Sequence, residues 1–249
     1  MAEPIRINRF FTEHGVCSRR AADKHVEAGR VRINGALAKH GDTVKEGDRV
    51  ELDGVRVAVP EKRPVVLAYH KRPGIECTSD RRVPENIIDA VGYPERIFHI
   101  GRLDKFSEGL ILLTNRGELV NQILRARGGH EKEYVVETDV PVSEQTLRRM
   151  RSGIVIQGRR TLPCKVTRLD ARVFRMVLTE GRNRQIRRMC EAEDLRVRRL
   201  QRVRVMNIEL GTLRPGRWRR LRDDELAALE KRLAKAERGS ARAELADAQ

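Results

Sequence analysis

The chain has 249 residues, enough for one or two domains with a real core, and it carries a formal charge of +16 with an isoelectric point near 10.5. Such a charge predicts a polyanionic partner, of which nucleic acid is the commonest. Four isolated cysteines, without a C-x-x-C pair or a histidine cluster, argue against a zinc site and a disulfide framework. No apolar run approaches the roughly 20 residues that cross a bilayer. We therefore expect a soluble, cytoplasmic protein with no membrane partner.

The N-terminal part of the chain has the pattern of a small mixed domain. Ser18 can cap a helix that runs to about Ala28. The Asn-Gly turn at 34–35 and the Asp-Gly turn at 53–54 are flanked by apolar strand residues, which predicts two β-hairpins. Prolines at both ends of residues 60–64 indicate a short linker to the rest of the chain.

This first segment, residues 1–60, resembles the S4 RNA-binding domain. The resemblance is carried by residues 5–11, 15–23 and 29–35. Without it, a solvated helix face would be the better interpretation of the basic side chains, because exposed Arg and Lys are ordinary. The resemblance implies instead that four cations face RNA, namely Arg19, Arg20, Lys24 and Arg32.

From residue 65 onward the predicted strands outnumber the helices and do not alternate regularly with them. This arrangement favours the α+β class over the α/β class. We predict a helix over residues 119–124, a closing helix over 226–233 and a disordered tail over 239–249. The predicted strands cover residues 65–68, 110–114, 134–136, 173–178 and 203–210.

The densest signal lies in residues 101–117, where a glycine-bounded loop leads into a buried strand. One acid, Asp104, lies in that loop with the basic neighbours Arg102 and Lys105. On its own this is a weak signal, because an aspartate in a turn more often caps the turn or pairs with a cation.

The same segment is similar to the pseudouridine synthase signature G-R-L-D-x-x-[ST]-x-G-L-L-x-L-T-N. Two further segments of that family follow in the same order, at residues 130–135 and 180–190. Together with the N-terminal domain, these three segments resemble the group of pseudouridine synthases that contains the RsuA, RluB, RluE and RluF types. Residues 130–134, 204–207 and 217–218 resemble the RluF type most.

The resemblance spans roughly residues 5–233 and implies a synthase domain over residues 65–233, built on a mixed, mainly antiparallel β-sheet with flanking helices. It implies that a specific uridine in ribosomal RNA becomes pseudouridine, with large-subunit RNA favoured and a tRNA left open as a further target. The catalytic residues implied are Asp104, Tyr134 and Arg187. We expect a monomer.

The reaction explains why these residue types recur. The bond from ribose C1′ to N1 must break and C1′ must join C5 without redox change, so no cofactor or metal is needed. One carboxylate suffices as nucleophile or base, and Arg187 nearby would keep Asp104 ionised. The base must leave its stack, after which Tyr134 could stack on it and Arg102 could fill the space it leaves. A core tyrosine and a simple phosphate contact are the alternative interpretations of Tyr134 and Arg187.

Positive charge is concentrated toward the C-terminal side of the synthase segment. Residues 181–222 hold 14 arginines against 4 acids, whereas residues 1–63 hold 13 Lys and Arg against 10 acids. This distribution argues against a uniformly basic, solvated surface, and arginine favours bidentate phosphate contacts. We expect RNA contacts from Arg184, Arg188, Arg198 and Arg199.

One segment departs from the family pattern: where the family has Asn-Lys-Pro-x-Gly, residues 70–74 read His-Lys-Arg-Pro-Gly, which leaves the path of this loop open. Two other functions are considered. A non-catalytic S4-type protein that grips ribosomal RNA would explain the charge but not three synthase motifs in order. A base-flipping glycosylase would use the same aspartate but release free uracil.

Overall fold

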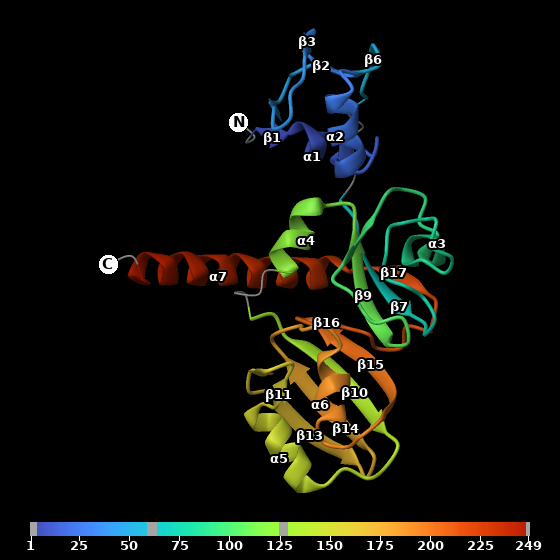
Figure 1. The fold of residues 1–249 in the computed structure, drawn as a ribbon, viewed down its shortest axis with the longest axis vertical. Helices are drawn as coiled ribbons and strands as arrows, with labels where there is room; N and C mark the ends of the chain where they lie inside the picture. Colours follow the sequence, from blue (N-terminus) through green and yellow to red (C-terminus); the bar gives the residue numbers. More distant parts are fainter. Residues whose placement is uncertain (1–3, 59–63, 125–128, 248–249) are drawn as a thin grey trace. The chain divides into compact units, whose positions relative to one another are not determined.

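The computed structural model describes residues 4–58, 64–124 and 129–247. The chain divides into two compact units, residues 1–64 and 65–249, which are described separately (Figure 1). The division falls at the end of the predicted linker, of which only Pro64 lies within the described residues.

The first unit packs two helices against short strands. Helix α2 (Arg19–Glu27) begins where predicted, since Ser18 Oγ accepts a hydrogen bond from the Ala21 N–H at 3.2 Å. Helix α1 (Ile7–Glu13), which the sequence did not predict, adds the buried rings of Phe10 and Phe11 to the core. One sheet has the order β3-β2-β5-β6 and a smaller pair joins β1 to β4: β1 (Ile5–Arg6), β2 (Val31–Ile33), β3 (Ala36–Leu37), β4 (Thr43–Val44), β5 (Val50–Leu52) and β6 (Val55–Arg56).

Both predicted hairpins of the first unit are confirmed. Asn34 and Gly35 have φ of 51° and 85°, and Asp53 and Gly54 have φ of 53° and 77°. Two successive left-handed residues are the requirement of a type I′ turn, which explains the Asn-Gly and Asp-Gly pairs.

The second unit is built on a mixed sheet of nine strands, with the main order β13-β14-β10-β15-β9-β7-β17. Every strand pairing in it is antiparallel except that of β15 with β9, which confirms a mainly antiparallel α+β fold. The strands are β7 (Val66–Lys71), β8 (Phe98–Ile100), β9 (Glu108–Thr114), β10 (Lys132–Thr138), β13 (Lys165–Asp170), β14 (Val173–Leu178), β15 (Val197–Val205), β16 (Ile208–Glu209) and β17 (Trp218–Arg220), with β11 (Val155–Ile156) and β12 (Arg159–Arg160) as a separate hairpin.

The parallel junction between β9 and β15 requires a glycine. Gly109 lies opposite Arg202 and has φ of 106°, and a Cβ added to it would lie 2.3 Å from the Arg202 carbonyl oxygen. Any side chain at this position would push the two strands apart. The junction joins two antiparallel halves of the sheet, one containing β7 and β9 and the other containing β10, β14 and β15.

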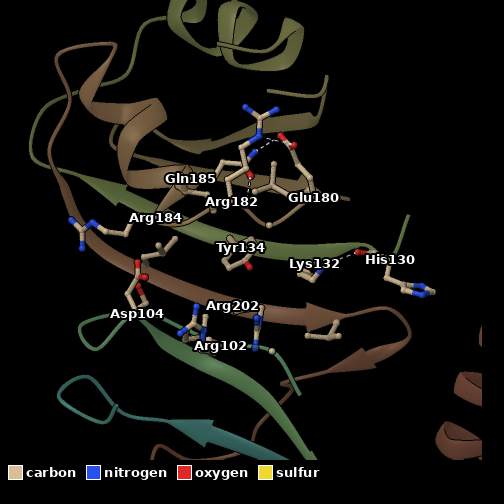
Figure 2. A pocket seen from close by; sticks show the side chains of 18 of the residues that line it. Arg102, Asp104, His130, Lys132, Tyr134, Glu180, Arg182, Arg184, Gln185 and Arg202 are labelled. Carbon is tan, nitrogen blue, oxygen red and sulfur yellow. Dashed lines mark hydrogen bonds and ion pairs between the residues drawn. The ribbon is translucent and has the colours of Figure 1, made fainter. Parts of the chain in front are cut away.

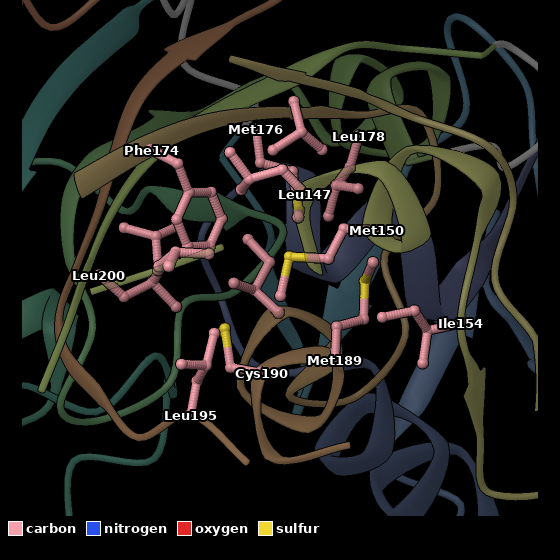
Figure 3. Close-up of a cluster of buried hydrophobic side chains, with 14 of the residues drawn as sticks. Leu147, Met150, Ile154, Phe174, Met176, Leu178, Met189, Cys190, Leu195 and Leu200 are labelled. Atoms are coloured by element: carbon pink, nitrogen blue, oxygen red, sulfur yellow. The ribbon is translucent and has the colours of Figure 1, made fainter. Parts of the chain in front are cut away.

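Each half of the sheet has its own helices and core. Helices α5 (Glu144–Ser152) and α6 (Gln185–Glu191) pack on β10, β13, β14 and β15, and Figure 3 shows Leu147, Met150, Met189 and Cys190 meeting strand residues such as Phe174. On the other half lie α3 (Ile87–Val91), α4 (Gly117–Leu124) and α7 (Asp223–Asp247).

One prediction for the C-terminal part is wrong. The strand expected over residues 203–210 is broken after Val205 by a tight turn, in which Met206 has φ of 55°, and resumes as β16. Helix α7 runs as far as Asp247, and Ala, Glu, Lys, Arg and Leu, which favour helix, dominate its last turns. Disorder over residues 239–249 stays a prediction. Residues 248–249 lie outside the described residues.

Candidate active site

The loop that carries Asp104 connects β8 to β9 and is closed as a tight turn. The Ser107 N–H donates to the Asp104 carbonyl at 3.0 Å, and the Leu103 N–H donates to Cys77 Sγ at 3.3 Å. Leu103 and Ser107 are both buried, so the loop is anchored before and after the aspartate. The Asp104 carboxylate itself remains partly exposed.

A buried lysine also holds this loop. The Lys71 side chain is fully buried, and its Nζ donates to the carbonyls of Lys105 at 3.0 Å and Arg72 at 2.9 Å. Burial lowers the pKa of Lys71 to about 8, against the opposing charges of Cys77, Asp104 and Glu108.

The path of the unusual segment 70–74 follows from these contacts. Strand β7 continues to Lys71, and the chain then turns at Pro73 and Gly74, where Gly74 has φ of 90°. The Gly74 N–H donates to the same Lys105 carbonyl at 2.8 Å. Despite the displaced proline, Lys71 and Gly74 both bind the loop that carries Asp104.

Arg187 on α6 lies beside Asp104, with 3.8 Å between its Nε and the Asp104 Oδ2. Its Nη2 donates to Ser107 Oγ at 3.3 Å and to the Phe106 carbonyl at 3.4 Å, and its Nη1 donates to the Val197 carbonyl at 3.4 Å. The buried Nε has no hydrogen-bond partner among the described residues. Burial lowers the pKa of Arg187, and the Asp104 charge opposes this by favouring the charged guanidinium.

A cavity of about 280 Å³ opens beside Asp104, at the junction of the two halves of the sheet. Figure 2 shows Asp104 toward one end of this cavity and Tyr134 near its middle, with Arg102 and Arg202 close by. Tyr134 of β10 is paired with Arg202 of β15 and contacts the cores of both halves. The aromatic ring is therefore fixed on the wall of a space that also reaches the carboxylate.

Arg202 offers the cavity a buried donor. Its side chain is 3% exposed, its Nε donates to the Leu110 carbonyl at 2.7 Å, and its Nη2 has no partner among the described residues. A buried donor without a partner costs about 1–3 kcal/mol, which a bound acceptor would relieve. A ligand with a carbonyl oxygen would supply such an acceptor.

Lys132 lies two residues before Tyr134 and also lines the cavity. Its Nζ donates to the His130 carbonyl at 3.1 Å, and burial followed by the Arg202 charge lowers the pKa of Lys132. The alternation of β10 directs Lys132 and Tyr134 to the same face.

A network of polar side chains fixes another wall of the cavity. Glu180 Oε1 accepts from Gln185 Nε2 at 2.7 Å and from the Leu162 N–H at 2.9 Å, and Glu180 Oε2 accepts from Arg182 Nε at 3.0 Å (Figure 2). This network places Arg184 at the start of α6 with φ of 51°, an uncommon conformation for an arginine. Arg184 lines the main cavity and two neighbouring ones.

The structure brings together Asp104, Tyr134, Arg187, Arg102 and Arg184 of the predicted site residues. Three other predicted arginines lie outside the main cavity. Arg188 is hydrogen-bonded to Gln157 and Asn183, Arg199 forms an ion pair with Glu108 at 2.5 Å, and Arg198 is exposed. In the first unit the four predicted cations are exposed: Arg19, Arg20, Lys24 and Arg32.

Sequence reasoning missed Lys71, Lys132 and Arg202. Lys132 had a usable signal, because it lies two residues before Tyr134 in the family segment 130–135. Lys71 also had one, because the family pattern Asn-Lys-Pro-x-Gly has a lysine at its position. Arg202 had none, since one arginine in the arginine-rich strand β15 gives no sign of the distant carbonyl that it binds. Among the described residues, no cluster of His, Cys, Asp or Glu is suited to a metal, and no helix is long and apolar enough to cross a membrane.

Comparisons with known proteins cover most of the chain. The RNA pseudouridylate synthase family matches residues 65–192, and the S4 domain matches residues 5–50. The dual-specificity RNA pseudouridine synthase RluF of Escherichia coli strain K12 is 47% identical over 228 residues, which are 91% of this chain and 79% of that protein. A protein of Aquifex aeolicus, named uncharacterized RNA pseudouridine synthase, is 38% identical over 91% of this chain and 94% of its own length. A crystal structure of a pseudouridylate synthase matches 90% of this chain and 99% of that chain, with a TM-score of 0.66 and 27% identity.

Proposed function

Because the chain belongs to the RNA pseudouridine synthase family, we propose that Asp104 is the catalytic carboxylate with which it isomerises uridine in RNA. The observation that carries this proposal is the position of Asp104. It lies 3.8 Å from Arg187 and borders a cavity that Tyr134 and the unpartnered Arg202 also line.

The isomerisation replaces one carbon–nitrogen bond with one carbon–carbon bond. The C1′–N1 bond breaks, C1′ joins C5, the proton on C5 leaves and N1 gains a proton, so the atoms of the nucleotide are conserved. An ionised Asp104 serves as nucleophile or as base in this sequence. The Arg187 guanidinium, held by Ser107 and two backbone carbonyls, would orient that carboxylate.

The remaining cavity residues would hold the uracil while it turns. Tyr134 supplies a face for stacking and a hydroxyl that can move a proton. Arg202 Nη2 supplies a donor to a uracil carbonyl, and Arg102, which is exposed at the loop, can occupy the space that the flipped base leaves. None of these steps requires a cofactor.

For the substrate we propose a specific uridine of large-subunit ribosomal RNA. The S4 unit, residues 1–60, would supply affinity and placement, and residues 65–233 would supply the chemistry. The Escherichia coli relative is named a dual-specificity enzyme, so tRNA belongs in the same test as a second RNA class. We propose that the protein acts as a cytoplasmic monomer, with phosphates contacted by Arg184, Arg188 and Arg198.

The decisive experiment is Asp104→Asn, which is nearly isosteric and removes the charge. Pseudouridine formation on large-subunit rRNA and on tRNA should fall to background, while the thermal transition and RNA affinity persist. The matched control is Asp170→Asn, which removes an exposed aspartate at the end of β13 and should retain full activity. A folded Asp104→Asn protein that still forms pseudouridine would refute the catalytic role. Free uracil released by the wild type would identify a glycosylase instead.

A further inference from the structure

Phe106 is an exposed aromatic residue in the middle of the catalytic loop. Its side chain is 70% exposed, although a phenylalanine ring is among the side chains that gain most from burial. The other exposed aromatic among the described residues, Trp218, is 38% exposed, hydrogen-bonded to the Val91 carbonyl and packed edge-on against Tyr93. Phe106 has no comparable ring contact within the described part of the chain.

The backbone that carries this ring is held on both sides. Before it, the Lys105 carbonyl accepts from Lys71 Nζ at 3.0 Å and from the Gly74 N–H at 2.8 Å. At the residue itself, the Phe106 carbonyl accepts from Arg187 Nη2 at 3.4 Å, and after it Ser107 is buried. Two residues of chain span at most about 7 Å, so the Phe106 Cα is held within about that distance of the Asp104 Cα.

Cations flank the backbone of this residue. Arg187 donates both to the Phe106 carbonyl and to the Val197 carbonyl at the start of the arginine-rich strand β15. The preceding residue, Lys105, is exposed and lines, with Arg184, a cavity that also contains Asp104. An exposed aromatic residue in a segment flanked by cations is the combination with which proteins hold single-stranded nucleic acid: the ring stacks a base and the cations take the phosphates.

We propose that Phe106 stacks on the nucleobase next to the target uridine in the bound RNA. The inference rests on the proposed function, because flipping one uridine out of the RNA leaves its neighbours without a stacking partner. The Phe106 ring takes the place of the flipped uridine as the stacking partner of one adjacent base. It thereby holds the RNA strand beside the cavity with the uridine flipped out. The family signature leaves this position variable, since it reads Asp-x-x followed by Ser or Thr, so the contact is a property of this chain.

The test uses the full-length protein and an RNA stem-loop that contains the uridine modified by the wild type. Phe106→Ala should raise KM by about 5- to 150-fold, the range expected for one lost base–aromatic stack, with kcat nearly unchanged. Phe106→Trp should keep the wild-type KM. Phe106→Leu should resemble Ala, because it keeps apolar bulk without a π-face. The control is Val155→Ala, which truncates another exposed apolar residue, on β11, and should leave KM unchanged.

A second measurement reports stacking directly. The nucleotide on either side of the target is replaced in turn by 2-aminopurine, whose fluorescence is quenched when it stacks. At one of the two positions, RNA bound to the wild type should be dimmer than RNA bound to Phe106→Ala. Equal emission for both proteins at both positions, or a Leu variant with the wild-type KM, overturns the inference. A wild type that forms no pseudouridine defeats the proposed function instead, and the fluorescence comparison still decides whether Phe106 stacks on RNA.

Discussion

The loop that carries Asp104 and the basic surface of the S4 unit present their side chains in opposite ways. Within residues 101–107 the backbone is held by Lys71, Gly74 and Cys77, and the aspartate has little freedom to move. In the S4 unit, the predicted RNA contacts are exposed side chains of α2 and β2. Among the described residues, for example, none forms a hydrogen bond or ion pair with the cationic group of exposed Arg20 or Lys24.

The difference reflects what catalysis and phosphate binding each require. Catalysis depends on atomic position, and an error of about 1 Å can cost 10²-fold in rate. Phosphate binding depends mainly on the number of charges and tolerates side-chain motion. Changes at the catalytic cavity should therefore have large effects on rate, whereas changes on the S4 surface should have small, additive effects on affinity.

After Asp104→Asn, the largest effect is expected from Tyr134→Phe, which keeps the ring and removes the hydroxyl. Affinity for RNA should persist, and kcat should fall by ~10²–10⁴-fold if the hydroxyl moves a proton. The measurement is single-turnover pseudouridine formation with saturating enzyme. The matched control is Tyr93→Phe, whose hydroxyl accepts a hydrogen bond from Arg220 outside the cavity. Full activity of the Tyr134→Phe variant would remove the hydroxyl from the mechanism.

The next effect concerns the buried lysine that holds the loop. Because the pKa of Lys71 is about 8 when folded and 10.5 when exposed, the unfolded chain binds more protons between these values. The free energy of unfolding should therefore gain roughly 3 kcal/mol from this group as the pH rises from 8 to 10.5, at 1.36 kcal/mol per pKa unit. Urea unfolding across this pH range should show the wild type gaining stability relative to Lys71→Met. The exposed Lys165→Met is the control. A constant difference would contradict the inferred burial cost.

A smaller effect is expected when the four S4 cations, Arg19, Arg20, Lys24 and Arg32, are replaced by alanine together. The log–log slope of RNA affinity against salt should become shallower by roughly 3, because each phosphate contact contributes about 0.7–0.9. The rate on fully bound RNA should not change. If a protein lacking residues 1–60 modifies structured RNA as well as the full chain does, the role assigned to this unit is wrong.

The smallest effect distinguishes two adjacent arginines. Arg198 is exposed, whereas Arg199 is paired with Glu108 at 2.5 Å. Replacing Arg198 with alanine should reduce the salt slope by about one contact, and replacing Arg199 should reduce it less. Equal slopes for the two variants would mean that the Glu108 pair opens when RNA binds.

Local features of the fold could be predicted from the sequence. The Asn-Gly and Asp-Gly turns and the Ser18 cap depend on neighbouring residues, and each was found. Helix α5 was missed although Ser143 caps it in the same way, with Ser143 Oγ accepting from the Thr146 N–H. The order of the strands could not be predicted, because the pairing of β15 with β9 joins distant residues without any local pattern.

The site shows the same division. Asp104, Tyr134 and Arg187 were predicted from motifs that are contiguous in the sequence, and the structure brings them together. Arg202 and Lys71 bind backbone carbonyls of distant segments, so these contacts depend on the tertiary fold. A contiguous motif can be recognised in the sequence, whereas a contact between distant segments cannot.

The pairing of β9 with β15 also sets the order in which the enzyme is completed during synthesis. Arg202 donates to a carbonyl 92 positions earlier in the chain, so the cavity cannot close until β15 has left the ribosome. Closing so long a loop costs entropy that short hairpins do not, and the S4 unit, complete by residue 64, can fold well before. The S4 unit of a nascent chain would thus be able to fold before the cavity that contains Asp104 is complete.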